Sequence, residues 1–335
     1  MKVYFLNTMS SGLETISLIQ KKHSIDGIIG LSHREKNDLI SDYVYQADFC
    51  NSHGLDFIEV DGYNLQNKFD REKISDLDID VLVVSGWQRL IPEWLISHVN
   101  KFVVGIHGSP LGITKGRGRS PQNWALILGL KDFYISIFII DTGIDSGKLI
   151  ATKKFSLGTY DDIKTSYYKA SILVSEMLVD LFSQNEIDEN NFILQNEEDA
   201  EYFPQRLPKD GGLDWNRSIE EIRGFVRALT KPYPGARTFI NKTEIIIWSL
   251  IPFEINYNVD AKNGEIVNIF NRKDILVKTK DGFLLINDFT IIDDKVELQE
   301  GMKFSSVPYP NQINEIITRH RIKYPKLPIS KLIDK

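Results

Sequence analysis

Short apolar runs alternate with longer amphipathic stretches over the first 157 residues. The runs are rich in β-branched residues and read KVYFL (2–6), DGIIGLS (26–32), LDFIEV (55–60), DVLVVSGW (80–87), FVVGIH (102–107) and YISIFII (134–140). This alternation predicts βαβ units in an α/β fold with a mostly parallel, doubly wound sheet. Ligands of such sheets bind outside the carboxyl ends of the strands, so we expect a site near residues 83–87, 106–109 and 138–141.

The pattern changes after the sheet. Residues 159–182 predict one long helix that begins with a Thr159/Asp162 capping pair. Short strands with polar turns then predict a small β-rich, OB-like barrel, at 244–254, 264–270, 274–282, 283–291 and 295–301. We therefore expect a first domain over 1–184, an acidic, proline-containing linker over 185–208, a β-barrel domain over 209–310 and a basic tail over 311–335.

Length, composition and charge narrow the class of protein. A chain of 335 residues suits two domains, and its apolar runs are far shorter than a membrane span requires. Cys50 is the only cysteine, which agrees with a cytoplasmic protein. Residues 1–208 carry 29 Asp and Glu against 20 Lys and Arg, an unfavourable balance for nucleic acid. From Arg319 onward six basic residues face one acid, and both a solvated tail and a phosphate-contacting tail stay open.

Two common kinds of site have no matching motif. One glycine follows the first strand where a dinucleotide fingerprint needs three, and no phosphate-binding P-loop pattern occurs. The six histidines show no metal-ligand spacing, so we expect no catalytic metal.

Three polar segments lie at the expected edge of the sheet. His107 stands between Gly105 and Gly108 where a strand ends. Residues 116–124, GRGRSPQNW, bring two arginines to the start of a helix, a combination that favours anions. Residues 138–149 hold Asp141 and Asp145 in a glycine-rich turn, where a carboxylate can act as a base or orient a histidine. Each feature alone also has an ordinary structural explanation, as a turn or a solvated loop.

The order of these segments resembles one known family. IHGSPLG (106–112), GRGRSPQNWALILGL (116–130) and IDTGIDSG (140–147) are similar to the core of the folate-dependent formyltransferases. This family includes methionyl-tRNA formyltransferases and nucleotide-sugar N-formyltransferases. The stretch 202–240 resembles the family's entry into its C-terminal domain. The resemblance implies a Rossmann-like catalytic domain, an OB-like C-terminal domain and N10-formyltetrahydrofolate as formyl donor.

The resemblance also implies roles for single residues. His107 and Asp145 match the family's catalytic histidine and aspartate. Gly86, Leu90 and Ile91 match the segment whose backbone contacts the pterin, and the turn with Asp141, Gly143 and Asp145 matches a second pterin-facing loop. Cations for a diphosphate are expected from position alone, at Arg89, Arg117, Arg119 and Lys231.

One position departs from the family's pattern. The family has an asparagine two residues before its histidine, and Gly105 stands there in this chain. Losing one oxyanion donor typically costs about 10²–10³ in rate. Three explanations stay open: a substitute donor (Asn123, Gln88 or a backbone N–H beside Gly105), an acceptor that tolerates a weaker site, or a folate- or sugar-binding protein with little catalysis.

Within the family, the resemblance favours a nucleotide-linked amino sugar as the acceptor. ALTKPYPGARTF (228–239) is similar to the segment of the sugar enzymes, and LSHREKNDLISDYV (31–44) lacks the glycine- and lysine-rich insert of the tRNA enzymes. The product would serve surface-polysaccharide biosynthesis. Methionyl-tRNA formylation is the alternative. Because family members often pair, a homodimer also stays open.

Overall fold

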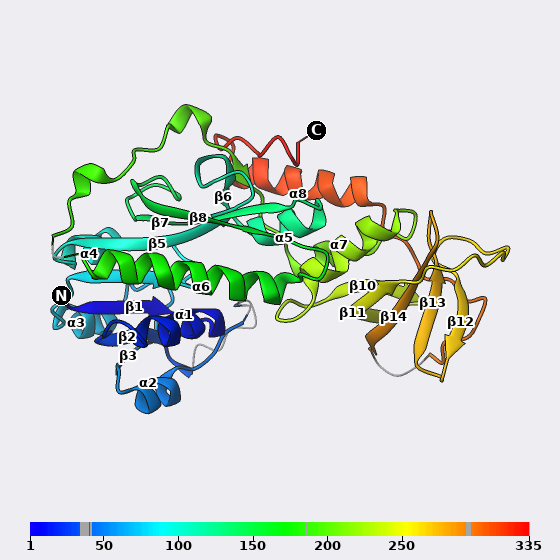
Figure 1. Cartoon of the computed structure of the whole chain (residues 1–335), viewed down its shortest axis with the longest axis horizontal. Helices are drawn as coiled ribbons and strands as arrows, with labels where there is room; N and C mark the ends of the chain where they lie inside the picture. The colour runs from blue at the N-terminus through cyan, green and yellow to red at the C-terminus, as the bar shows by residue number, and fades with distance from the viewer. Residues whose placement is uncertain (34–39, 41, 185, 293–295, 335) are drawn as a thin grey trace. The chain divides into compact units, whose positions relative to one another are not determined.

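The computed structural model describes residues 1–33, 40, 42–184, 186–292 and 296–334 (Figure 1). Its contacts divide the chain into two compact units. The first comprises Met1–Arg117, Asp132–Ser156 and Tyr167–Ala200, and the second comprises Gly118–Lys131, Leu157–Ser166 and Glu201–Lys335. The chain therefore passes between the units several times rather than once.

A seven-stranded sheet forms the centre of the first unit, in the order β3-β2-β1-β4-β5-β7-β8. Its strands are β1 (Val3–Asn7), β2 (Gly27–Leu31), β3 (Asp56–Val60), β4 (Val81–Ser85), β5 (Phe102–Ser109), β7 (Asp132–Ile139) and β8 (Leu149–Ser156). The first five strands in this order are parallel, and β7 runs antiparallel to its neighbours β5 and β8. The predicted Rossmann-like, doubly wound α/β sheet is confirmed.

Helices cover both faces of this sheet (Figure 1). They are α1 (Ser10–Gln20), α2 (Ala47–His53), α3 (Lys68–Ser75), α4 (Glu93–His98) and α6 (Ile163–Phe182), with 3₁₀ turns η2 (Thr114–Gly116), η3 (Glu189–Asn191) and η4 (Glu197–Asp199). Alternate residues of each strand enter opposite cores because side chains of a strand point to opposite faces. Val3 and Phe5 pack with α1 and α6, while Tyr4 and Leu6 pack with α3 and α4.

The strand order reverses between β1 and β4. The segments that follow these two strands contact each other, and the segment after β4 contains Gly86. Asn7, the last residue of β1, is fully buried, and its side chain folds back onto the backbone of Met9. Thr8 donates a hydrogen bond to the carbonyl of Gly86, which has a left-handed φ of 75°. In doubly wound sheets the ligand crevice lies at such a reversal, so we expect ligands outside the carboxyl ends of β1 and β4.

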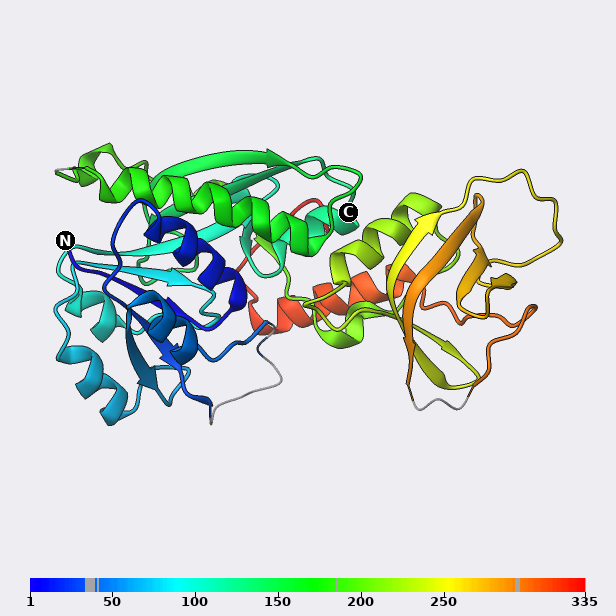
Figure 2. The ribbon, with the colours of Figure 1, turned by 60° about the horizontal axis from the view of Figure 1, so that its bottom comes forward.

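The second unit contains an antiparallel sheet in the order β10-β11-β14-β13-β12, coloured from yellow-green to orange in Figure 2. These strands are β10 (Ala236–Ile240), β11 (Thr243–Pro252), β12 (Ile266–Phe270), β13 (Asp274–Lys278) and β14 (Phe283–Ile291). The unit also holds α5 (Pro121–Ile127), α7 (Ile219–Leu229), α8 (Tyr309–Lys323), η5 (Pro208–Gly211) and β9 (Tyr202–Phe203), which pairs with β6 (Arg117–Gly118). The predicted β-rich C-terminal domain is confirmed.

Several elements differ from the sequence-based expectation. We expected a strand at 295–301. This prediction is wrong for the described residues 296–301, which contain no strand. Between β2 and β3 the described helix is α2, and residues 34–39 and 41 lie outside the described part. The segment after Arg319 continues helix α8, and Ile329 then pairs in parallel with Tyr202. None of the described helices is long and apolar enough to cross a membrane.

Gly224 tests whether packing or helix propensity governs α7. A glycine inside a helix normally costs about 0.5–1 kcal/mol relative to alanine. A Cβ on Gly224, however, would lie 2.8 Å from the carbonyl oxygen of Leu126 in α5, too close for any real contact. We therefore expect Gly224→Ala to lower the melting temperature, measured by circular dichroism. A raised melting temperature would contradict this packing.

Candidate active site

His107 lies near the carboxyl end of β5, one strand away from the crevice between β1 and β4. Its side chain is 9% exposed and its Nε2 lies 2.7 Å from the carbonyl oxygen of Gly116, at the end of η2. A carbonyl oxygen only accepts, so Nε2 carries the hydrogen of this bond. The other ring nitrogen, Nδ1, lies 3.5 Å from Oδ2 of Asp145.

This arrangement defines where a proton can be held. With Nε2–H committed to Gly116, Nδ1 is the nitrogen that gains or loses a proton, and it faces the Asp145 carboxylate. At 3.5 Å the two atoms are within ion-pair range and slightly beyond the usual length of a hydrogen bond. The pair can therefore exchange a proton between Nδ1 and the carboxylate. The two residues that the sequence pointed to as a pair are brought together.

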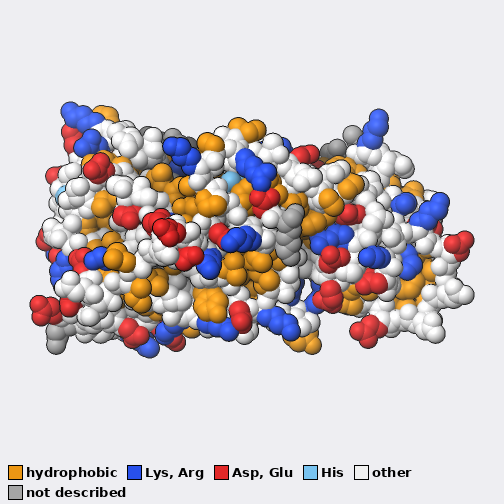
Figure 3. Space-filling model, turned by 90° about the horizontal axis from the view of Figure 1, so that it is seen from above, with side chains coloured by type: hydrophobic (Ala, Val, Ile, Leu, Met, Phe, Trp, Pro, Cys, Tyr) orange, Lys and Arg blue, Asp and Glu red, His pale blue; other side chains and the backbone are white. Residues whose placement is uncertain are grey.

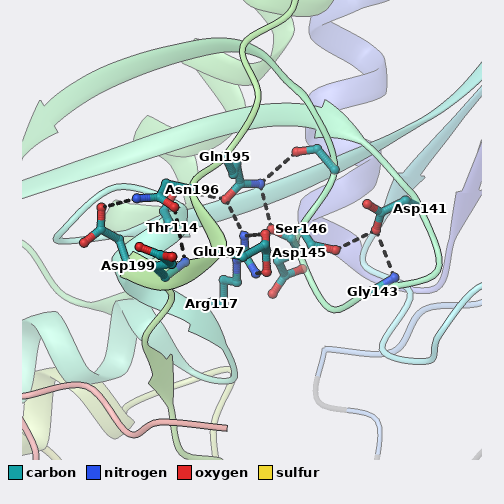
Figure 4. Close-up of polar contacts among 12 residues, drawn as sticks. Thr114, Arg117, Asp141, Gly143, Asp145, Ser146, Gln195, Asn196, Glu197 and Asp199 are labelled. Carbon is teal, nitrogen blue, oxygen red and sulfur yellow. Dashed lines mark hydrogen bonds and ion pairs between the residues drawn. The ribbon is translucent and has the colours of Figure 1, made fainter.

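Asp145 belongs to a tight turn between β7 and β8. Its backbone is left-handed, with φ of 53°, a conformation that asparagine and aspartate adopt more readily than most residues. Asp141 shapes the start of the turn, because its Oδ1 accepts hydrogen bonds from the N–H of Gly143 and the hydroxyl of Ser146 (Figure 4). Gly147 allows the closing approach, since a side chain there would collide with the carbonyl of Ile139.

Gln195 connects this turn to the one that holds His107. Its Nε2 donates to the carbonyls of Asp145 and Gly147, each at 2.8 Å (Figure 4). Its Oε1 accepts from the Thr114 hydroxyl and from Nη2 of Arg117, each at 3.0 Å. The segment around Gln195 was expected to be a connector, and the polar contacts of this residue were not foreseen.

Arg117 is fully buried and carries its charge into the same network. Its guanidinium forms a two-point ion pair with Glu197, with N–O distances of 2.7 and 2.6 Å. Hydrogen bonding from Arg117 lowers the pKa of the Glu197 carboxyl below its ordinary value of 4.5. Arg117 was expected to contact a diphosphate, and such a contact stays a prediction; the structure places its guanidinium on protein oxygens.

Gly105 is not an open space beside His107. It pairs with Val84 of β4 and with Phe138 of β7, and a Cβ at this position would lie 2.5–2.7 Å from the Phe138 ring and 3.0 Å from Ile140. The ring of Phe138 thus fills the space into which an asparagine side chain would project. No side-chain amide can stand at this position without moving an aromatic ring.

The segment after β4 presents the residues expected to face the pterin. Gly86 is held by Thr8, Leu90 is 69% exposed, and Ile91 packs against the core. The Arg89 guanidinium stacks on the ring of Tyr63 at 4.9 Å. Gln88, one of the expected substitute donors, bonds through its backbone N–H to the Tyr63 hydroxyl and through Nε2 to the Met9 sulfur.

The remaining expected residues lie in the second unit. The Asn123 amide, buried at 2% exposure, donates to the carbonyl of Ala228 in α7. The N–H of Arg119 donates to the carbonyl of Phe203, and Nζ of Lys231 lies over the Trp248 ring at 5.2 Å. Their roles toward a substrate stay predictions. In the described part of the chain, no group of three or more metal-ligating side chains comes together.

Comparison with known protein families decides the relationship. The Formyl transferase family model matches residues 13–181, and the Formyl transferase C-terminal domain model matches residues 207–299. The chain belongs to the formyl transferase family. The first stretch contains every strand of this formyltransferase's seven-stranded sheet except β1, and the second contains all strands of its antiparallel sheet.

Individual relatives of this formyltransferase differ in what they act on. It is 26% identical over 226 residues to a methionyl-tRNA formyltransferase of Ruminiclostridium cellulolyticum, covering 67% of this chain and 70% of that one. Its fold matches HypX from Aquifex aeolicus in complex with tetrahydrofolic acid (TM-score 0.60, 15% identity), over 95% of this chain and 47% of that one. It also matches an N-formyltransferase from Helicobacter canadensis in complex with folinic acid and dTDP-3-aminofucose (TM-score 0.57, 16% identity), over 87% of this chain and 100% of that one.

A double-mutant cycle tests the packing at Gly105. We expect Gly105→Asn to lower the melting temperature in the wild-type background because its side chain meets the Phe138 ring. In a Phe138→Ala background, itself destabilised by about 3–5 kcal/mol, the same substitution should cost much less. Thermal unfolding of the four proteins gives the coupling. Equal costs in both backgrounds would contradict the steric account.

Proposed function

We propose that this formyltransferase transfers a formyl group from N10-formyltetrahydrofolate to the primary amine of a nucleotide-linked amino sugar. The observation that carries the proposal is the pair of His107 and Asp145, held at the carboxyl end of β5 next to the crevice between β1 and β4. The formylated sugar would serve surface-polysaccharide biosynthesis.

The loop after β4 has the chemistry to bind a pterin. Leu90 offers an exposed apolar side chain, and Nε1 of Trp87 is a buried donor with no hydrogen-bond partner in the described structure. A flat heterocycle with polar edges needs both kinds of contact. When bound here, N10-formyltetrahydrofolate supplies the formyl group, and Gly86, Leu90 and Ile91 hold its ring system.

The protein's part in the chemistry is to move one proton and to stabilise charge. As the acceptor amine attacks the formyl carbon, its nitrogen must lose a proton, and Asp145 is the carboxylate that accepts it, directly or through a water molecule. The bond between the formyl carbon and N10 would then break, and the carboxylic acid of Asp145 would return the proton to the departing N10. Nδ1 of His107 faces this carboxylate, so the ring can share the proton, while the bond from Nε2 to Gly116 keeps the ring in one orientation.

Negative charge on the formyl oxygen needs a donor that Gly105 cannot provide. The imidazolium of His107, formed when Nδ1 takes the proton, would stabilise this charge through its own positive charge, because its two N–H groups point to Gly116 and Asp145. The Phe138 ring occupies the side of the strand where an amide would otherwise stand. We therefore assign His107 both proton sharing with Asp145 and stabilisation of the oxyanion.

The charge of the chain favours a sugar acceptor over a transfer RNA. Residues 1–208 have an excess of nine acids over bases, which opposes contact with nucleic acid phosphates. On the face shown in Figure 3, acidic and basic side chains of the described residues are interspersed rather than gathered into one basic field. In the segment 31–44, which lacks the insert of the tRNA enzymes, residues 34–39 and 41 lie outside the described part of the chain.

An acceptor panel tests this proposal. We expect formylation of at least one dTDP-, UDP- or GDP-linked amino sugar with N10-formyltetrahydrofolate, followed by mass spectrometry, and no turnover of methionyl-tRNA. Formylation of methionyl-tRNA alone would overturn the sugar assignment. Folate binding without turnover of any acceptor would instead indicate a binding protein.

Substitutions test the two catalytic roles. We expect Asp145→Asn and His107→Gln each to lower kcat by at least about 10², because each removes a group that carries the transferred proton. His98→Gln is a matched control, since Nε2 of His98 also bonds a backbone carbonyl, that of Leu77, outside the site. Asp132→Asn controls for loss of a carboxylate, as Asp132 pairs with Lys154 at the surface. Activity within a few-fold of wild type in Asp145→Asn or His107→Gln would overturn the roles.

A further inference from the structure

Gln195 turns inward from a segment whose neighbours face solvent. Leu194 and Asn196 are exposed, whereas Gln195 is half-buried. The segment is fastened two residues earlier, where Ile193 and Leu149 exchange two backbone hydrogen bonds at the start of β8. This fixes the position from which the Gln195 side chain reaches the site.

The Gln195 amide uses its full hydrogen-bonding capacity. A carboxamide has two N–H hydrogens and one oxygen with two lone pairs. Both hydrogens go to carbonyls of the Asp145 turn, and both lone pairs are taken by Thr114 and Arg117. The four partners also settle which end is nitrogen, since carbonyls accept and a guanidinium only donates.

Those four partners belong to the two turns that hold the proton-exchanging pair. One turn carries Asp145 itself. The other runs from Thr114 to Arg117 and includes Gly116, whose carbonyl holds Nε2 of His107. The Gln195 side chain therefore ties the backbone of the Asp145 turn to two side chains, Thr114 and Arg117, of the turn that orients the imidazole.

The ion pair of Arg117 and Glu197 secures the same connection from the other side. Arg117 has no solvent exposure, so its charge depends on protein partners, and Glu197 supplies both carboxylate oxygens. Glu197 follows Gln195 by two residues. The acidic segment therefore contacts the site through Gln195 and Glu197, in addition to linking two parts of the chain.

We propose that Gln195 is a positioning residue that sets the distance between the Asp145 carboxylate and the His107 ring. The proposal rests on the roles given above to these two residues. Replacing Gln195 removes the hydrogen bonds that join the two turns. The Asp145 carboxylate and the His107 imidazole are then no longer held at a fixed distance, although neither residue is altered.

The first test observes the His107 ring directly and needs no acceptor. In protein labelled with ¹⁵N-histidine, His107 signals are identified by their loss in His107→Gln. We expect a hydrogen-bonded Nε2–H proton signal in the wild type and its loss to solvent exchange in Gln195→Ala. Leu194→Ala, an exposed neighbour, is the matched control and should keep the signal. An unchanged signal in Gln195→Ala would overturn the proposal.

The second test is a kinetic cycle with the amino sugar that is turned over fastest. We expect Gln195→Ala to lower kcat about tenfold or more, the effect of about 1.4 kcal/mol, with the KM for N10-formyltetrahydrofolate within about threefold. In an Asp145→Asn background the same change should cost less than about twofold, because Gln195 acts through Asp145. Equal costs in both backgrounds would overturn the proposal.

Gln195→Glu serves if the alanine variant does not fold. It has the same size, but its carboxylate cannot donate to the Asp145 and Gly147 carbonyls, so the same losses are expected. Melting temperatures of all variants separate misfolding from mispositioning. If Asp145→Asn lowers kcat and Gln195→Ala does not, only this inference is overturned. If Asp145→Asn leaves kcat unchanged, the proposed function is overturned and this inference with it.

Discussion

Nε2 of His107 donates a hydrogen bond to the carbonyl of Gly116, and the chemistry of the site depends on this bond. It fixes the ring orientation and leaves Nδ1 as the nitrogen that faces Asp145. A turn can serve as such an acceptor only if its own backbone is held. The contacts of Thr114 and Arg117 with Gln195 provide that support, on both sides of Gly116.

The sheet imposes a second constraint at the same strand. Residues 105 and 107 lie on the same face of β5, because side chains alternate along a strand. On that face Phe138 projects from the antiparallel strand β7 toward Gly105. The position of the Phe138 ring therefore requires a glycine at residue 105. Under the proposed function, stabilisation of the oxyanion then falls to His107, because the Phe138 ring leaves no room for a side-chain amide at position 105.

The acidic segment has a different role from the one its composition indicates. Seven acids without a base between residues 185 and 201 are typical of a solvated connector. Most of its described side chains do face solvent. Gln195 and Glu197 differ in their contacts. Gln195 donates hydrogen bonds to the carbonyls of Asp145 and Gly147, and Glu197 neutralises the buried Arg117. The average composition of the segment cannot identify these two residues, because the direction of their side chains depends on where the backbone is held by hydrogen bonds, as between Ile193 and Leu149.

The sequence by itself determined the α/β sheet, the β-rich C-terminal domain and the pair His107 and Asp145. Apolar periodicity reports which face of an element is buried, and motifs at strand ends report where side chains converge. Tertiary structure alone decided the contacts between distant segments: Gln195 with the Asp145 turn, Glu197 with Arg117, and Phe138 against Gly105. These contacts join residues whose local sequence carries no signal of one another. Their partners are set by how strands and turns pack, so they became visible only when the chain was folded.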